Sequence, residues 1–139
     1  MEWLQQNWTT VLISVVLLLL VFKGIILGKL FGIKSMDVQE LNKRIQQTPN
    51  SILLIDVRTP QEFKSGHIKG AKSMPLGQIS QQLNSIPDDQ RHLPVAVICA
   101  SGSRSMMGAT RIKKAGFKTI FNVSGGMMAW ERSRFPITH

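Results

Sequence analysis

Two short apolar runs place the strongest limits on the fold of this chain. The run "SILLIDV" occupies residues 51–57 and the run "PVAVICA" occupies residues 94–100. Both are continuous, and both are rich in aliphatic residues, many of them β-branched. Runs of this length and composition predict parallel strands that are buried on both faces of a sheet.

Helix and strand signals alternate through the part of the chain that contains these runs. The expected elements, in chain order, are a helix from Asp37, a strand at 51–57, a helix from Thr59 to Gly66, a strand near 72–74, a helix through 76–86, a strand at 94–100, a helix from 103 to Gly116 and a strand at 118–123. Such alternation with short loops predicts an α/β domain with a mainly parallel central sheet and helices on both faces. We place this single domain at residues 35–139.

The N-terminal segment, residues 1–34, has a different composition. Residues 8–27 contain one charge, Lys23, and a helix of about 20 residues matches the thickness of a bilayer core. We therefore predict one transmembrane helix here, followed by a basic linker, and a lipid bilayer as a partner. Lys29 and Lys34 follow the span, which predicts a single-pass protein of the cell inner membrane with its C-terminal domain in the cytoplasm.

A cleaved signal peptide is the alternative interpretation of this segment. The residues before the apolar run include Glu2 but no Lys or Arg, and no small-x-small cleavage site follows the run. Both observations favour the transmembrane helix.

The chain contains a single cysteine, Cys99, which cannot form an internal disulfide. No Cys/His cluster has the spacing of a zinc site, so we predict neither a metal nor another cofactor. Cys99 is then either a small buried apolar residue or a reactive thiol. It lies at the carboxyl end of a predicted parallel strand, where α/β sheets bind ligands, and this position favours the reactive thiol.

The residues after Cys99 have the properties of an anion-binding turn. Successive backbone N–H groups of small residues can converge on one point, and the following helix directs the positive end of its dipole there. This environment favours the thiolate. The predicted substrate-binding residues are Ala100, Ser101, Gly102, Ser103, Arg104 and Ser105. Arg104 would add a planar, charged donor, with an ordinary solvated surface charge as the alternative.

Three segments carry a resemblance to a known family. "CASGSRS" (99–105) resembles the active-site loop of rhodanese-family sulfurtransferases, which often has the form Cys-x-x-Gly-x-Arg-Ser. "LLIDVRTPQEFKSGHIKGA" (53–71) is similar to the upstream signature of the family, and "AGFKTIFNVSGGMMAW" (115–130) to its closing segment. Together the matches cover nearly all of the predicted domain, and they imply a rhodanese-like fold.

The resemblance implies a thiosulfate sulfurtransferase-like enzyme in which Cys99 is the catalytic residue. Cys99 would take a sulfane sulfur from thiosulfate or a related anionic donor and pass it, as a persulfide, to cyanide or a thiol, including a protein thiol. Asp56 and Arg58 would support the loop. His67 and Trp130 are expected to have packing roles.

Two other functions remain open from the sequence. Cysteine phosphatases hold one residue more between Cys and Arg than the four that separate Cys99 from Arg104. A membrane-tethered binding or regulatory module with little turnover is the second alternative. The net charge of +9 does not favour nucleic acid as a partner, because the chain has no Tyr and its other aromatic residues are assigned to the core or the membrane.

Overall fold

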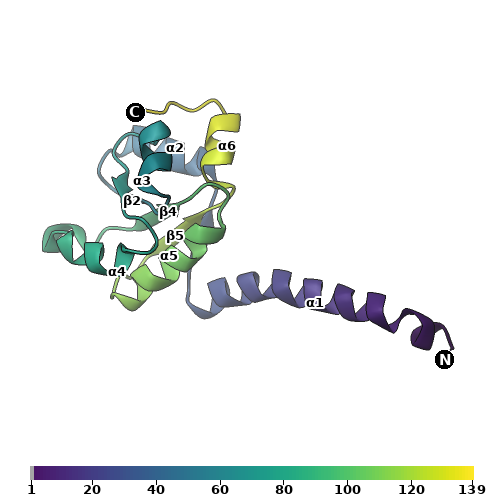
Figure 1. The fold of residues 1–139 in the computed structure, drawn as a ribbon. Helices are drawn as coiled ribbons and strands as arrows, with labels where there is room; N and C mark the ends of the chain where they lie inside the picture. Colours follow the sequence, from purple (N-terminus) through teal and green to yellow (C-terminus); the bar gives the residue numbers. More distant parts are fainter. Residues whose placement is uncertain (1) are drawn as a thin grey trace.

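The computed structural model describes residues 2–139, and for residues 2–6, 21, 24, 25, 27 and 28 it describes the backbone only. Helix α1 (Glu2–Leu30) projects away from the domain formed by the rest of the chain (Figure 1). Its backbone departs from helical geometry at Asn7, with φ −120° and ψ 15°. Because α1 runs from Glu2 to Leu30, the predicted helix at 8–27 is present and is longer than predicted at both ends.

The apolar side chains of α1 lie in the open. Eleven residues from Trp8 to Phe22 have large apolar side chains that are between 39% and 62% exposed. Within the described residues, however, no helix combines the length and the apolar character needed to cross a membrane. The predicted transmembrane span at 8–27 is thus not supported, and the side chains of four of its residues, 21, 24, 25 and 27, lie outside the description.

The domain is built on a parallel sheet of five described strands. The strands are β1 (Lys34–Met36), β2 (Leu53–Asp56), β3 (Lys72–Ser73), β4 (Val95–Ile98) and β5 (Ile120–Val123). Their order is β1-β5-β4-β2-β3, and every neighbouring pair is parallel. All residues of β2 and β4 are buried, so the prediction of a parallel central sheet from these two apolar runs is confirmed.

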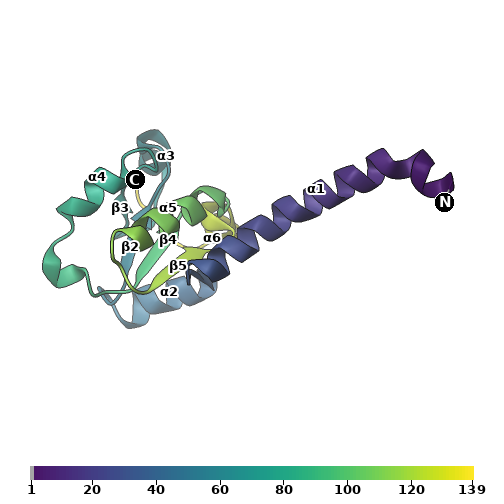
Figure 2. The same cartoon turned by 90° about the horizontal axis from the view of Figure 1, so that it is seen from below.

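Helices cover both faces of this sheet (Figure 2). On one face, α4 (Ile79–Gln82) and α5 (Ser103–Lys114) pack on side chains that include Ile55 and Val97. On the other face, α2 (Val38–Gln47) and α6 (Gly126–Arg132) pack on side chains that include Leu54 and Ile98. Alternate residues of one strand thus enter opposite halves of the core.

Local signals fix where the short helices begin and end. Helix α3 (Pro60–Ser65) begins with a capping box, in which Thr59 Oγ1 accepts from the Glu62 backbone N–H at 3.2 Å and the Thr59 backbone N–H donates to Glu62 Oε1 at 3.4 Å. The helix expected through 76–86 is shorter than predicted, because α4 passes at Leu83 into the 3-10 turn η1 (Leu83–Ser85), with a second turn, η2 (Asp88–Gln90), after Pro87. Its apolar residues Ile79, Leu83 and Ile86 are nevertheless buried together.

Candidate active site

Cys99 stands at the carboxyl end of β4, at the start of the loop that leads into α5. We call residues 99–105 the thiol loop. The Cys99 side chain is only 1% exposed. Gly102, directly before α5, has φ +107°, a left-handed conformation that favours glycine and lets the chain reverse tightly around the sulfur.

The Cys99 sulfur is hydrogen-bonded to groups of the thiol loop. The Gly102 backbone N–H donates to Sγ at 3.0 Å, and Sγ lies 3.3 Å from Ser105 Oγ. Burial raises the pKa of the Cys99 thiol. Hydrogen bonding with the Ser105 hydroxyl, and then with the backbone amides of Ser105, Gly102 and Ser101, outweighs this effect and brings the pKa below its ordinary value. The loop therefore favours a thiolate that water barely reaches.

The N-terminal end of α6 fixes the opposite side of the thiol loop. The Met127 N–H donates to the Cys99 carbonyl at 2.8 Å, and the Met128 N–H donates to the Ala100 carbonyl at 3.0 Å. The approach is so close that a Cβ on Gly126 would lie 2.3 Å from the Cys99 carbonyl oxygen. These two hydrogen bonds anchor the loop to α6.

Ser105 and Asn122 form a polar contact beneath the sulfur that the sequence analysis did not identify. Ser105 is fully buried, and its hydroxyl lies within hydrogen-bond distance of both Asn122 Oδ1 and the Gly102 carbonyl. Asn122 also donates through Nδ2 to the Gly102 carbonyl at 3.2 Å. A signal was present, because Asn122 is the one strongly polar residue inside the otherwise apolar strand β5.

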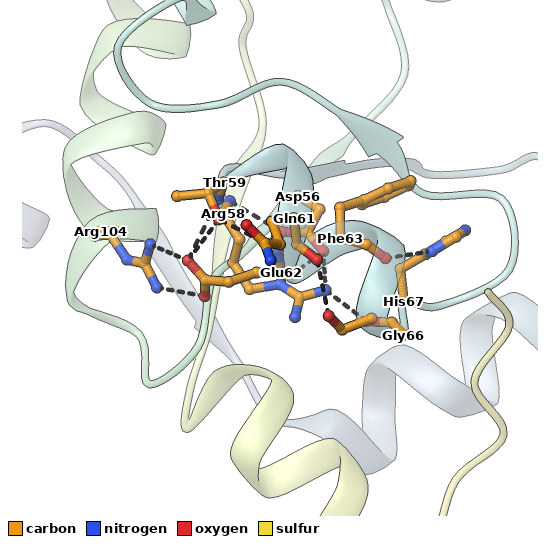
Figure 3. A network of polar contacts seen from close by, with 10 residues as sticks. Asp56, Arg58, Thr59, Gln61, Glu62, Phe63, Gly66, His67 and Arg104 are labelled. Carbon is orange, nitrogen blue, oxygen red and sulfur yellow. Dashed lines mark hydrogen bonds and ion pairs between the residues drawn. The ribbon is translucent and has the colours of Figure 1, made fainter.

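Arg104 is engaged by a carboxylate from another element. Its Nη1 and Nη2 atoms donate to Oε1 and Oε2 of Glu62 at 2.8 and 2.9 Å, a two-pronged pair that joins α5 to α3 (Figure 3). This contact, with smaller effects of Thr59, lowers the pKa of Glu62 to about 2 against desolvation. The guanidinium, which the sequence analysis expected to face a donor anion or the solvent, is thus paired with Glu62.

Asp56 and Arg58 form a buried ion pair at the carboxyl end of β2, seen beside α3 in Figure 3. Arg58 Nη2 donates to Asp56 Oδ2 at 2.7 Å and to the Gly66 carbonyl at 2.8 Å. One residue on from Asp56, the Val57 N–H donates to the Ile98 carbonyl at 3.0 Å, just before Cys99. The pair therefore holds the chain next to the start of the thiol loop and does not touch the sulfur.

The other residues that the sequence pointed to lie on the thiol loop or pack in the domain. Ser101 and Ser103 are exposed on the thiol loop, while Ala100 is half-buried. The His67 ring stacks on Phe63 with 3.7 Å between ring centroids, and its Nδ1 lies 2.8 Å from the Phe63 carbonyl oxygen. Trp130 is buried and donates to the Pro136 carbonyl. In the described part of the chain, no cluster of three His, Cys, Asp or Glu residues is placed to hold a metal ion.

Comparison with known proteins places this arrangement in a family. The protein-family model for the rhodanese-like domain matches residues 37–133 of the sequence, which include every site residue described above. The chain belongs to the rhodanese-like domain family. Two related proteins are a sulfurtransferase of Allochromatium vinosum, 32% identical over 76% of this chain and 94% of its own length, and the putative sulfurtransferase YtwF of Bacillus subtilis, 36% identical over 75% and 96%.

A solved structure agrees with this assignment. The crystal structure of a rhodanese-like domain protein from Staphylococcus aureus superimposes with a TM-score of 0.62 at 32% identity, over 70% of this rhodanese-like protein and 91% of that chain. The α/β fold with a parallel central sheet is therefore the rhodanese-like fold. The related proteins named as sulfurtransferases support a sulfurtransferase function at the level of the family.

Proposed function

We propose that this rhodanese-like protein transfers a sulfane sulfur from an anionic donor, such as thiosulfate, through a persulfide on Cys99 to a thiol or cyanide acceptor. The observation that supports this most is the hydrogen bond from the Gly102 N–H to Cys99 Sγ at 3.0 Å, in a loop where Cys99 is almost fully buried. It prepares a thiolate nucleophile and leaves the loop amides near the place where negative charge develops on the outer sulfur.

The proposed reaction has two steps. The Cys99 thiolate attacks the outer sulfur of thiosulfate, the donor S–S bond breaks, and sulfite leaves with the electron pair. The resulting Cys99 persulfide anion is then attacked at its outer sulfur by cyanide or a thiolate. Thiocyanate or a new persulfide leaves the site, and the Cys99 thiolate returns. Neither step needs a proton transfer from His67, a metal or an added reductant.

Steady-state turnover of the full chain tests this proposal. With thiosulfate and cyanide, we expect thiocyanate and sulfite in equal amounts, and Cys99→Ser should form neither because serine cannot hold a persulfide. Hydrolysis of an aryl phosphate without thiocyanate formation would favour the phosphatase alternative. No turnover of either substrate would favour a binding module.

We also propose that α1 attaches the protein to the inner membrane, with the C-terminal domain in the cytoplasm and the lipid bilayer as a partner. The exposed apolar side chains of α1 and its projection away from the domain support this proposal (Figure 1). So do Lys29 and Lys34, which follow the apolar run on the side of the domain.

A further inference from the structure

The ion pair between Arg104 and Glu62 lies at the outer edge of the thiol loop. Both side chains are 35% exposed, so an incoming donor can approach the pair from solvent. Arg104 precedes Ser105, whose hydroxyl lies 3.3 Å from the Cys99 sulfur. The negative charges of Cys99 and Asp56 also act on the Arg104 guanidinium, which places it within electrostatic range of the nucleophile.

Glu62 is held in this position from its own helix as well. The Thr59 hydroxyl donates to Glu62 Oε1 at 3.1 Å, and the Thr59 backbone N–H donates to the same oxygen at 3.4 Å. The carboxylate is therefore fixed by α3 and by Arg104 together. A donor anion that reaches the loop meets Arg104 with Glu62 already beside it.

The Arg104–Glu62 pair affects how strongly the site attracts donors of different negative charge. A guanidinium that is paired through Nη1 and Nη2 with a carboxylate forms a pair with little net charge at a distance. The carboxylate also repels any second anion. The backbone amides of the thiol loop remain as the uncancelled attraction. They act on the attacked sulfur of any donor alike, so a second negative charge on the leaving group gains no added attraction from the Arg104–Glu62 pair.

We propose that Glu62 is a specificity-determining residue that disfavours dianionic sulfur donors relative to singly charged persulfides. The inference rests on the proposed sulfur transfer and narrows the donor class. In both cases the Cys99 thiolate attacks the outer sulfur and the donor S–S bond breaks. A thiolate leaves from a persulfide and sulfite leaves from thiosulfate, so the two donors differ at this site mainly in the charge of the leaving group.

The test compares two donors in the full chain carrying Glu62→Gln. Glutamine keeps the length of the side chain and can still accept in the capping box, but it removes the charge that neutralises Arg104. With cyanide as the acceptor, the measured quantity is kcat/KM for thiosulfate divided by kcat/KM for the persulfide of 2-mercaptoethanol. We expect this ratio to rise several-fold, on the order of threefold to tenfold, in Glu62→Gln.

The matched control is Glu40→Gln. Glu40 pairs with Arg44 at 2.8 Å within α2, away from the thiol loop, so its removal should leave the ratio at the wild-type value. In the double variant Glu62→Gln/Arg104→Gln, the ratio should fall back toward wild type because both charges are gone. The ratio should fall more steeply with salt in Glu62→Gln than in the unaltered chain, in which only the net charge of +9 distinguishes the two donors.

Each outcome decides the proposal. A folded Glu62→Gln protein with an unchanged or lower ratio would overturn it, as would an equal rise in Glu40→Gln. If Glu62→Gln fails to fold, Arg104→Gln decides, because it leaves the Glu62 carboxylate uncompensated and should lower the ratio, and an unchanged or higher ratio would overturn the proposal. If neither donor yields a Cys99 persulfide in the unaltered chain, the proposed function itself fails. A persulfide formed without the change in ratio overturns only the role of Glu62.

Discussion

At Cys99, burial and hydrogen bonding act in opposite directions on the thiol. A cysteine that is 1% exposed in an apolar core would have a raised pKa and would be inert, yet here the contacts with Ser105 and the loop amides bring the pKa below its ordinary value. Ser105 has a single hydroxyl proton, which can point to Asn122 Oδ1 or to the sulfur. When Cys99 loses its proton, the sulfur becomes the stronger acceptor.

Removing the Ser105 hydroxyl should therefore make the thiolate harder to form. In Ser105→Ala, we expect the pH midpoint of Cys99 alkylation by iodoacetamide to move upward, since one of the hydrogen bonds that favour the charged form is lost. The measurement is the alkylation rate against pH, followed by intact mass.

A matched control for this prediction lies in the same loop. Ser103→Ala removes an exposed hydroxyl and keeps the backbone amide, so the midpoint should stay where it is. If Ser105→Ala and Ser103→Ala give the same midpoint as the unaltered chain, the buried hydroxyl has no part in activating Cys99.

Between elements, the site depends on close contacts of α5 with α3 and of the thiol loop with α6. The Arg104–Glu62 pair provides the first, and the N–H groups of Met127 and Met128 provide the second. Since the loop itself is short and irregular, these neighbours define its shape.

The Arg104–Glu62 pair predicts a pH-dependent stability difference. The pKa of Glu62 is about 2 in the folded chain and 4.5 as the reference value, so its ionised form favours the folded state above pH 4.5. This contribution is lost as the pH falls from 4.5 toward 2. Glu62→Gln should unfold more easily than the unaltered chain at pH 6, by about 1 kcal/mol or less because solvent screens the pair.

The difference between the two proteins should shrink as the pH falls through that window. Urea denaturation at several pH values measures it. A stability difference that is the same at pH 6 and at pH 2.5 would show that the charge of Glu62 contributes nothing and that the loss comes from packing.

The contact between α6 and the thiol loop predicts an intolerance at Gly126. A Cβ there would lie 2.3 Å from the Cys99 carbonyl oxygen and 2.7 Å from the carbonyl of Ala100, and these are backbone atoms that cannot move aside alone. Gly126→Ala should lower the free energy of unfolding by about 2 kcal/mol more than Gly32→Ala, judged by urea denaturation.

Gly32 is the matched position, because it has a similar φ, +66° against +55°, and nothing within 4 Å of its would-be Cβ. Both substitutions include the cost of a left-handed alanine, and only one includes the clash. Equal destabilisation in the two variants would contradict the close approach of α6 to the thiol loop.

The sequence predicted the elements that have strong local signals and missed those that depend on distant contacts. The buried strands β2 and β4 and the capping box at Thr59 could be inferred from composition and spacing. Strand β1 has three residues and exists through its pairing with β5, which no local pattern reveals. The partner of Arg104 was missed for the same reason, because Glu62 lies 42 residues away along the chain.

At the scale of the whole molecule, a compact domain and a projecting apolar helix share one chain. The two features make different demands, since the thiol loop needs a rigid sheet while the exposed side chains of α1 are unfavourable in water. The net charge of +9 would attract the protein to anionic lipid headgroups and anionic donors alike.

Attachment through α1 can be tested by fractionation. The full chain should remain in the membrane fraction after carbonate extraction, and the double substitution Leu17→Lys/Leu18→Lys should release it, because charges in the apolar run are costly in a bilayer. The paired substitution Lys113→Gln/Lys114→Gln on α5 is the control and should not release it. Recovery of the unaltered chain in the soluble fraction would end the proposal of a membrane anchor.

Intact-protein mass spectrometry can show whether Cys99 receives and returns a sulfur atom. Thiosulfate added without an acceptor should increase the mass of the full chain by one sulfur, located on the peptide that contains Cys99, and cyanide should then remove it as thiocyanate. Cys99→Ser should gain no mass. An unaltered chain that stays at its original mass after thiosulfate and after a small persulfide, or a Cys99→Ser chain that still gains one sulfur, would rule out Cys99 as the sulfur carrier.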